Sequence, residues 1–352
     1  MSETAERSAD VMGQPPGGGP PARNGAGGLA RRAGEIFLRQ REASVLLIAV
    51  VMFIYFAVST SGFRNHNSYV NIAQYLAPYT IAGIGLVFLM IAGEIDISVG
   101  FVWTLSPFVL HFFYDSGLPV FAAIVLTVAV LSLVGLFNGV ITTMFGVPSL
   151  ITTLATGFIL YGLTLVWSSS QQIPMPPGEI GLGRWFGGQG WSEFIWATVL
   201  VILFQVILTR TRWGLYTIAV GGNLLGAREA GIKVNWIKIG NFMVTSALGA
   251  LAGIEESFRI NTIDPSAGQL GVVLVSLAGV VIGGTAMTGG SGTVLGLWLG
   301  MLALAILQDG FNLRGIASDK LQIIEGAAIL VAMIANTYIN RLRSAGRLHS
   351  RV

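Results

Sequence analysis

The sequence predicts an all-α polytopic membrane protein with about ten transmembrane helices. The chain has 352 residues, of which 53% are hydrophobic and only 11% are charged. Several uninterrupted apolar runs approach or exceed the roughly 20 residues that a helix needs to cross a bilayer. The predicted spans are residues 43–59, 69–92, 98–114, 120–144, 148–167, 194–208, 239–255, 270–287, 293–312 and 321–340.

Basic residues gather in three places, which predicts the orientation of these spans. The groups are Arg31, Arg32, Arg39 and Arg41 before the first span, Arg210, Arg212, Arg228, Lys233 and Lys238 after the sixth, and Arg341, Arg343, Arg347 and Arg351 after the last. Because cytoplasmic loops carry the excess of Lys and Arg, all three groups are predicted to be cytoplasmic. An even number of spans in total, and an even number before the central loop, satisfies this orientation. Both termini are therefore expected in the cytoplasm.

The chain divides into three segments by composition. Residues 1–40, whose first part is rich in Gly and Pro, are predicted to be a disordered cytoplasmic tail because they carry too little apolar surface to fold. Residues 41–341 form the predicted transmembrane domain, with a cytoplasmic loop at about 210–238, and residues 342–352 form a basic cytoplasmic tail. The first residues lack the basic region and apolar run of a signal peptide, so the first span is expected to be retained as an anchor.

Composition also excludes several functions. The net charge of +3 is small and lies mainly at the ends and in one loop, so nucleic acid is not an expected partner. With no cysteine, the chain has no disulfide or thiolate metal site. A phosphate-binding loop needs Gly-Lys followed by Ser or Thr, and none of Lys233, Lys238 and Lys320 follows a glycine. The Gly-Gly-Ser-Gly run at 289–292 therefore predicts a tight turn or a close contact between helices.

Residues 93–100, with the sequence Gly-Glu-Ile-Asp-Ile-Ser-Val-Gly, place two carboxylates between apolar runs. Polar residues alternate with Ile and Val here, which favours extended backbone over helix. Extended backbone within a membrane persists only where protein or a water-filled cavity covers it. We predict a non-helical junction in which Asp96 or Ser98 caps the helix that includes Gly100; Glu94 has no assigned role. A metal site is not expected, because residues two apart do not share a helix face and no histidine lies nearby.

The central basic loop predicts a short helix, a glycine turn, a short amphipathic helix and a glycine C-cap over residues 213–232. Such a segment is either a docking surface or an ordinary helix lying on the membrane surface. We interpret it as a docking surface, since the pattern contains more structure than a connection requires. Its candidate contact residues are Gly221, Gly222, Asn223, Ala227, Arg228, Glu229 and Gly231.

Polar residues inside the predicted spans are candidates to line a path for a hydroxylated solute. They also have plain alternatives, because Thr often bonds within its own helix and neighbouring amides bind one another. The candidates are Asn71, Gln74, Asn138, Thr152, Thr156, Gln308 and Asn312. Separately, Glu255, Glu256 and Arg259 end the seventh span, where they predict either a solvated cluster at the outer interface or a docking surface.

Four ordered blocks of this sequence resemble the ribose-type monosaccharide permeases of ABC transporters. The blocks are residues 93–100, 211–232, 283–296 and 308–315, within a similarity that runs from about 40 to 340. The chain departs from the usual family pattern at Glu94, where glycine is common, at Ser291, where a basic residue is common, and at Gln308 and Asp309, where paired Asn is common. These departures fall in blocks near the expected translocation path and bear on which sugar is carried.

The resemblance implies a multi-pass protein of the bacterial inner, or cytoplasmic, membrane that imports a monosaccharide or related polyol. It implies three protein partners: an ABC ATPase subunit, an external solute-binding protein, and a second permease copy or paralogue. No cofactor is expected in this chain, because ATP is bound by the partner subunit; the chain is a transporter subunit and not an enzyme. Two alternatives remain, namely the same fold importing branched-chain amino acids or nucleosides, and a proton-coupled secondary transporter with Asp96 and Glu94 as its relay.

Overall fold

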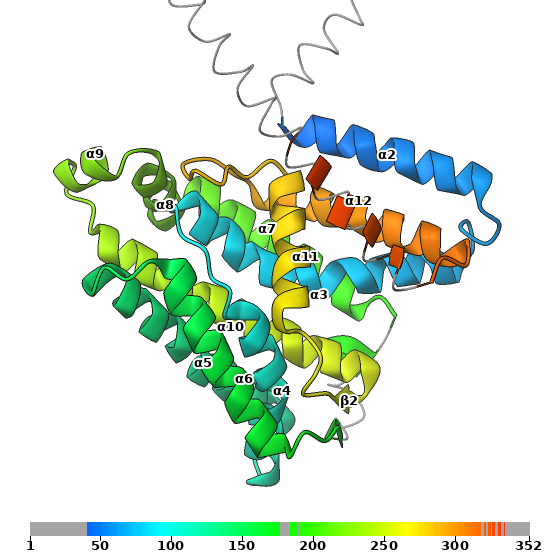
Figure 1. Cartoon of the computed structure of the whole chain (residues 1–352), viewed down its shortest axis with the longest axis horizontal. Coiled ribbons are helices and arrows are strands. Elements are labelled where there is room, and N and C mark those ends of the chain that lie inside the picture. Colours follow the sequence, from blue (N-terminus) through cyan, green and yellow to red (C-terminus); the bar gives the residue numbers. More distant parts are fainter. Residues whose placement is uncertain are drawn as a thin grey trace, which may run out of the picture. The chain divides into compact units, whose positions relative to one another are not determined.

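The computed structural model of the chain describes residues 41–176, 184–188, 190–317 and single positions between 320 and 334. Helices account for most of these residues (Figure 1). They are α2 (Arg41–Ser59), α3 (His66–Ile91), α4 (Val99–Asp115), α5 (Val120–Met144), α6 (Ser149–Ser168), the π-helical turn η1 (Arg184–Gly188), α7 (Ser192–Arg210), α8 (Arg212–Gly222), α9 (Leu224–Glu229), α10 (Val234–Ile260), α11 (Gln269–Ile282) and α12 (Val294–Leu313). Two short strands, β1 (Ile173–Pro174) and β2 (Thr262–Ile263), pair antiparallel.

The described helices match most of the predicted spans. Within the described residues, seven helices are long and apolar enough to cross a membrane, namely α2, α3, α5, α6, α7, α10 and α12. Two helices are shorter than these seven: α4 has 17 residues, as predicted, and α11 has 14, four fewer than its predicted span. The tenth predicted span, 321–340, and both predicted tails, 1–40 and 342–352, lie wholly or mainly outside the described residues. The count of ten therefore stays a prediction.

Glycine ends three of the helices that concern the function. After α3, Gly93 has φ +81°, and the amides of Gly93 and Glu94 donate to the carbonyls of Met90 and Leu89. This pair of backbone bonds is the Schellman motif, whose left-handed position glycine occupies without steric cost. The same motif ends α9 at Gly231 and α11 at Gly284. The eighth span was predicted to run to 287 and is wrong by one turn, because Gly284 stops the helix at Ile282.

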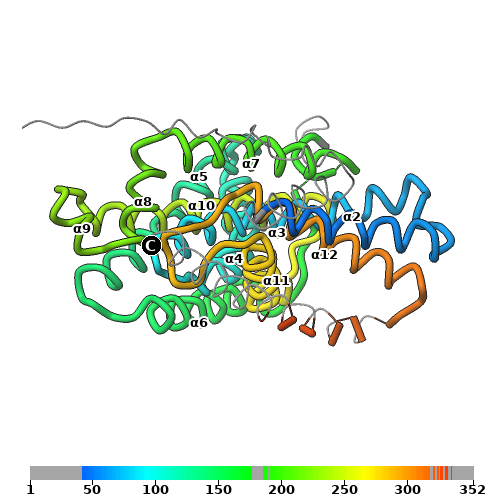
Figure 2. The backbone as a smooth tube through the Cα atoms, turned by 90° about the horizontal axis from the view of Figure 1, so that it is seen from above, coloured from blue at the N-terminus to red at the C-terminus, as the bar shows by residue number. Residues whose placement is uncertain are grey.

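Helices α3 and α10 form the centre of the bundle. Both have many neighbours: α3 packs against α7, α10, α11 and α12, and α10 against α3, α4 and α5 (Figures 1 and 2). Buried residues make up 83% of the apolar window of α3, compared with 17% in α2. The peripheral helices therefore present apolar side chains to the surroundings, as expected for helices that face lipid.

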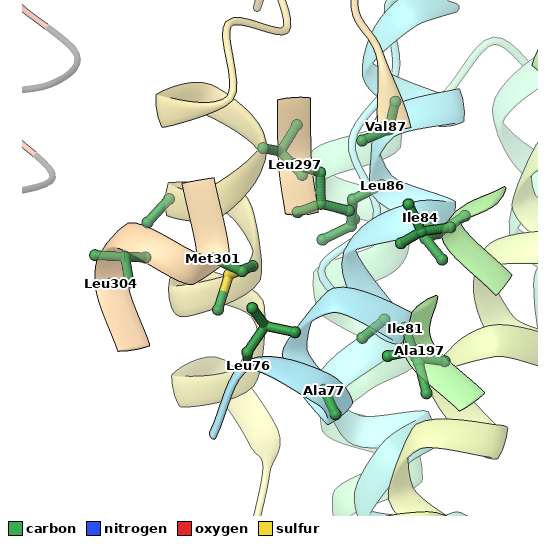
Figure 3. Packing of buried hydrophobic residues seen from close by; sticks show 14 of the residues in the cluster. Leu76, Ala77, Ile81, Ile84, Leu86, Val87, Ala197, Leu297, Met301 and Leu304 are labelled. Atoms are coloured by element: carbon green, nitrogen blue, oxygen red, sulfur yellow. The ribbon is translucent and has the colours of Figure 1, made fainter. Parts of the chain in front are cut away.

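Many of the side chains in the core between α3, α7 and α12 are aliphatic (Figure 3). Leu86 of α3 lies beside Leu297 of α12, and Ile81 lies beside Ala197 of α7. Small residues bring the helices close: a Cβ at Gly83 would lie 2.8 Å from a methyl carbon of Leu297. Close packing through small residues is the usual way in which helices associate inside membranes, where burial from water supplies no driving force.

The shortness of α4 follows from the segment before it. Residues 94–98 are not helical, although Ser98 at the N-cap of α4 already has helical backbone angles. The segment leads into the bundle, since the backbone oxygen of Val99 lies against Gly249 in the middle of α10. Helix α4 itself is about 26 Å long, slightly less than the roughly 30 Å of a hydrocarbon core. The predicted non-helical junction is confirmed, and Asp96 and Ser98 within it are buried by the surrounding protein.

Candidate coupling loop, helix junctions and polar path

The loop between α7 and α10 has most of the predicted architecture. Thr211 caps α8 by accepting a bond from the amide of Gly214 at 3.3 Å, and Asn223 caps α9 by accepting from the amide of Gly226 at 2.9 Å. Side-chain caps satisfy amide groups that lack a partner in the first turn of a helix. The two predicted short helices and the glycine after the second are confirmed. The predicted glycine turn is wrong, because Gly221 and Gly222 end α8 as helical residues and the extended residue Asn223 separates the helices.

One face of the α8–α9 loop is exposed and the other is packed. Gly222, Asn223, Arg228 and Glu229 are exposed, Gly221 is half-buried, and Gly231 is exposed at the C-cap. Ala227 is buried with Val220, Val234 and Ile237, so the loop packs on the first turns of α10. Leu224 and Leu225 point outward and are 39% and 67% exposed. Two exposed leucines beside polar residues form an apolar patch available for contact.

The ends of α3 and α8 meet the glycine-rich turn before α12. The carbonyl oxygen of Ile91 accepts a bond from the amide of Gly290 at 2.8 Å. Gly221 packs directly against the same carbonyl oxygen, because a Cβ atom at Gly221 would be only 1.6 Å from the oxygen of Ile91. The predicted turn at 289–292 is confirmed, with φ values of +86° at Gly289 and +76° at Gly290. Three segments distant in sequence thus share one backbone contact.

Within the α3–α4 junction, Asp96 organises the start of α4. One carboxylate oxygen of Asp96 accepts bonds from the amide of Ser98 at 2.7 Å and from its hydroxyl at 2.6 Å. Ser98 occupies the N-cap position, but its side chain makes no cap bond. Of the two predicted cap residues, only Asp96 binds backbone here. Gly100 is needed for packing, since a Cβ there would lie 2.0 Å from the carbonyl oxygen of Gln269.

Glu94, which the sequence left without a role, forms an ion pair. Its Oε1 atom lies 2.5 Å from Nζ of Lys238 in the second turn of α10. Both side chains are mostly buried, with exposed fractions of 14% and 15%. The two residues are 144 positions apart in sequence. The pair joins the end of the α3 region to the helix that follows the α8–α9 loop.

A buried chain of hydrogen bonds continues from the junction into α5 and α6. The amide group of Asn138 donates to the Ser98 hydroxyl at 2.8 Å, and the Thr156 hydroxyl donates to the Asn138 carbonyl oxygen at 2.7 Å. The backbone amide of Ile97 donates to the Thr153 hydroxyl at 3.0 Å. Buried polar groups in low-dielectric surroundings are costly without partners, and the Asn138, Ser98 and Thr156 side chains supply one another with hydrogen bonds here. The segment at 93–100 is therefore fastened inside the bundle.

The path candidates fall on two pairs of helices. Asn138, Thr152 and Thr156 belong to α5 and α6, where the Thr152 hydroxyl is buried without a hydrogen-bond partner. The others belong to α3 and α12: Asn71 donates to Asp309 at 3.3 Å, and Ser68 also donates to that carboxylate. On these helices Gln74 is half-buried, Asn312 is exposed, and the Gln308 carbonyl oxygen is buried without a partner. Polar side chains thus line both helix pairs at several depths.

The acidic cluster at the end of α10 is not fully solvated, which was one of its two predicted interpretations. Glu255 is only 1% exposed, and Glu193 at the start of α7 is fully buried. Arg259 lies 2.5 Å from Glu256 and 3.6 Å from Glu193. The prediction of a solvated cluster is wrong for Glu255, because the η1 segment packs against α10 at this residue.

A family model described as branched-chain amino acid transport system, permease component, matches residues 68–333. That range covers most of the chain and includes the junction, the α8–α9 loop and the glycine-rich turn. The chain belongs to this permease family. The match shows that it is a multi-pass membrane transport component.

Curated relatives of this family extend over nearly the whole chain. A xylose/arabinose import permease of Sulfolobus acidocaldarius is 35% identical over 314 residues, covering 86% of this chain and 87% of that protein. Ribose import permeases of Haemophilus influenzae and Escherichia coli are 32% and 31% identical, over 317 and 307 residues. Each of these two alignments covers 95% of the relative, and 87% and 86% of this chain. No solved structure matches.

Sequence reasoning missed three residues that position these sites. Lys238 was assigned only to the basic loop, and Glu193 and Gln205 were given no role. In the structure, the Gln205 carbonyl oxygen accepts bonds from the amides of Val294 and Leu295 at the start of α12. For Gln205 the available signal was a polar residue inside a predicted apolar span, which indicates a partner without identifying it.

Proposed function

We propose that the chain is the membrane-spanning permease subunit of an ABC importer that translocates a monosaccharide or related polyol. The observation that carries this proposal is the identity of 31–35% with import permeases for ribose and for xylose and arabinose, over 86–87% of the chain. The description of the family model names branched-chain amino acids as the solute, whereas the names of the relatives specify sugars. The full-length relatives favour a sugar.

Uptake by the complete transporter tests the substrate. The permease, reconstituted in vesicles with its ATPase and solute-binding protein, should accumulate a labelled pentose or hexose when ATP is present. Leucine and a nucleoside serve as competing substrates in the same vesicles. Accumulation of either of these without any sugar would overturn the sugar proposal.

We further propose that a separate ATPase subunit docks on the α8–α9 loop, because the described chain offers an exposed apolar patch there. Leu225 is 67% exposed on a loop bordered by basic residues that favour the cytoplasm. Leu225→Asp and Gly222→Arg should abolish substrate-stimulated ATP hydrolysis while the permease still inserts into the membrane. Leu313→Asp, at an exposed position at the far end of α12, is the control and should retain stimulation. Equal stimulation in all three variants would remove the docking role.

Import driven by ATP hydrolysis in a partner subunit can be distinguished from proton-coupled transport by the energy source that it requires. In a proton-coupled transporter, Glu94 and Asp96 would act as relay groups, whereas here Glu94 binds Lys238 and Asp96 binds Ser98. Vesicles that contain the permease without an ATPase should not accumulate substrate when a proton gradient is imposed. Accumulation under those conditions would refute the ABC mechanism.

The remaining partners and the orientation follow from the same proposal. An external solute-binding protein delivers the sugar, and a second permease copy or paralogue completes the pathway within a bacterial cytoplasmic membrane. The path candidates on α3, α5, α6 and α12 would contact the sugar hydroxyls. Because the sequence has no cysteine, single cysteines placed in the loops can report which side of the membrane each loop faces.

A further inference from the structure

The α8–α9 loop and the first turns of α10 form one packed unit. Ala227 of α9 and Val220 of α8 are buried together with Val234 and Ile237 of α10. Closely packed side chains transmit displacement, because a protein interior has little free volume. A force applied to the exposed face of α9 therefore also displaces the start of α10. Lys238 lies in that part of the helix, one residue after Ile237.

Lys238 is bound to Glu94 in the α3–α4 junction, which connects to α5 and α6. Its partner Glu94 follows the glycine that ends α3, and the two charged atoms are 2.5 Å apart. Two residues later, Asp96 holds Ser98, and Ser98 accepts the hydrogen bond of Asn138. The non-helical backbone from Glu94 to Ser98 thus connects Glu94 to the Asn138 side chain of α5, which is bound in turn to Thr156 of α6.

The ion pair is suited to this task by its surroundings. Both side chains are about 85% buried, so the attraction between them is screened less than that of a surface pair. The non-helical segment between Glu94 and Ser98 has no helical hydrogen bonds of its own and is bound by side chains of neighbouring helices. The segment can therefore be displaced together with Glu94 without breaking the hydrogen bonds of a helix.

We propose that the Glu94–Lys238 ion pair transmits movement of the α8–α9 loop to the α3–α4 junction, and so couples ATP hydrolysis to opening of the solute path. This inference rests on the proposed function, because it requires an ATPase that moves the loop. Glu94 and Lys238 act as positioning residues and do not contact the solute. A purely structural ion pair would stabilise the fold without affecting the ratio of transport to hydrolysis.

The test measures solute uptake per ATP hydrolysed by the complete reconstituted transporter. Four permeases are compared with the natural one: Glu94→Gln, Lys238→Met, the double variant Glu94→Gln/Lys238→Met, and the charge exchange Glu94→Lys/Lys238→Glu. The neutral double variant leaves no unpaired buried charge, so it separates loss of the link from the destabilisation that an unpaired charge causes. The amount of assembled complex is measured for each.

We expect the single variants and the neutral double variant to lower uptake per ATP at least five-fold. The charge exchange should restore the ratio to within two-fold of the natural permease. A natural ratio in the neutral double variant would overturn the inference, and so would a charge exchange that assembles normally and remains as uncoupled as the single variants. The failure of the proposed function is distinguishable, since it would show as an absence of ATP-dependent uptake in the natural permease.

Discussion

Two adjacent glycines at the end of α8 differ sharply in what surrounds them. A Cβ at Gly221 would lie 1.6 Å from the carbonyl oxygen of Ile91 and 2.7 Å from the amide nitrogen of Gly290. A Cβ at Gly222 would find its nearest atom, the Cα of Gly290, at 4.0 Å. Neither glycine has a positive φ, so alanine fits the backbone conformation of both. The pair Gly221→Ala and Gly222→Ala therefore isolates the close contact from the general effect of replacing glycine.

The size of the effect follows from the geometry. Carbon and carbonyl oxygen atoms approach to about 3.3 Å, so Gly221→Ala forces the backbones apart by roughly 1.5 Å. Overpacking of this kind costs about 1–3 kcal/mol, and loss of the bond from Gly290 to Ile91 costs about 1 kcal/mol more. Alanine regains up to about 1 kcal/mol through its higher helix propensity. We expect a net destabilisation of about 1–3 kcal/mol for Gly221→Ala, and a neutral or slightly stabilising effect for Gly222→Ala.

Thermal unfolding of the purified permease in detergent measures this difference. The eight tryptophans of the chain provide an intrinsic fluorescence signal. Gly221→Ala should unfold several degrees below the natural protein, whereas Gly222→Ala should unfold at the natural midpoint or slightly above it. Equal midpoints for the two variants, or the reverse order, would refute the three-way backbone contact.

Three further substitutions and one control variant test other parts of the structure by the same unfolding assay. Asn138→Ala should destabilise by about 2–4 kcal/mol because it breaks two buried hydrogen bonds, whereas Thr142→Val on the same helix should be nearly neutral because that hydroxyl has no partner. Gln205→Leu should cost about 1–2 kcal/mol by releasing two amides at the start of α12, and an unchanged midpoint would contradict this cap. Glu255→Gln should raise the midpoint, because a carboxylate that is 1% exposed and lacks hydrogen-bond partners opposes folding; a lower midpoint would contradict that account.

Local features of the fold could be predicted from the sequence. The positions of the helix ends at Gly93 and Gly231 follow from the need for a left-handed residue, which is a property of a few consecutive residues. The non-helical junction was predicted from the alternation of polar residues with Ile and Val over residues 93–100. Apolar runs likewise locate the long helices, because the period and length of a run determine whether it can span a bilayer.

Long-range partners could not be predicted. Glu94 and Lys238 are 144 residues apart, and no local pattern relates them. The burial of Glu255 depends on η1, which packs against α10 from elsewhere in the chain. Sequence identifies a charge inside a membrane domain as costly, but its partner depends on the packing of the whole bundle.

Contacts between distant segments sort the helix ends into two groups without reference to a membrane. In the first group, the end of α3 touches the end of α8 and the turn before α12, and the Thr293 hydroxyl donates to Glu42 in the first turn of α2 at 2.9 Å. In the second group, Arg314 after α12 donates to Ser59 at the end of α2, and β1 pairs with β2. Helices α2 and α12 both begin at the first group and end at the second, so these two helices run parallel to each other.

The predicted topology gives the last predicted span a role. It counts nine spans among the helices from α2 to α12, with α4 and α11 as one span each, and an odd number would place the end of α12 opposite the start of α2. The basic residues 341–351 favour the same side as those at 31–41, since both groups obey the same charge rule. We therefore expect the apolar residues 321–340 to supply one more crossing after α12.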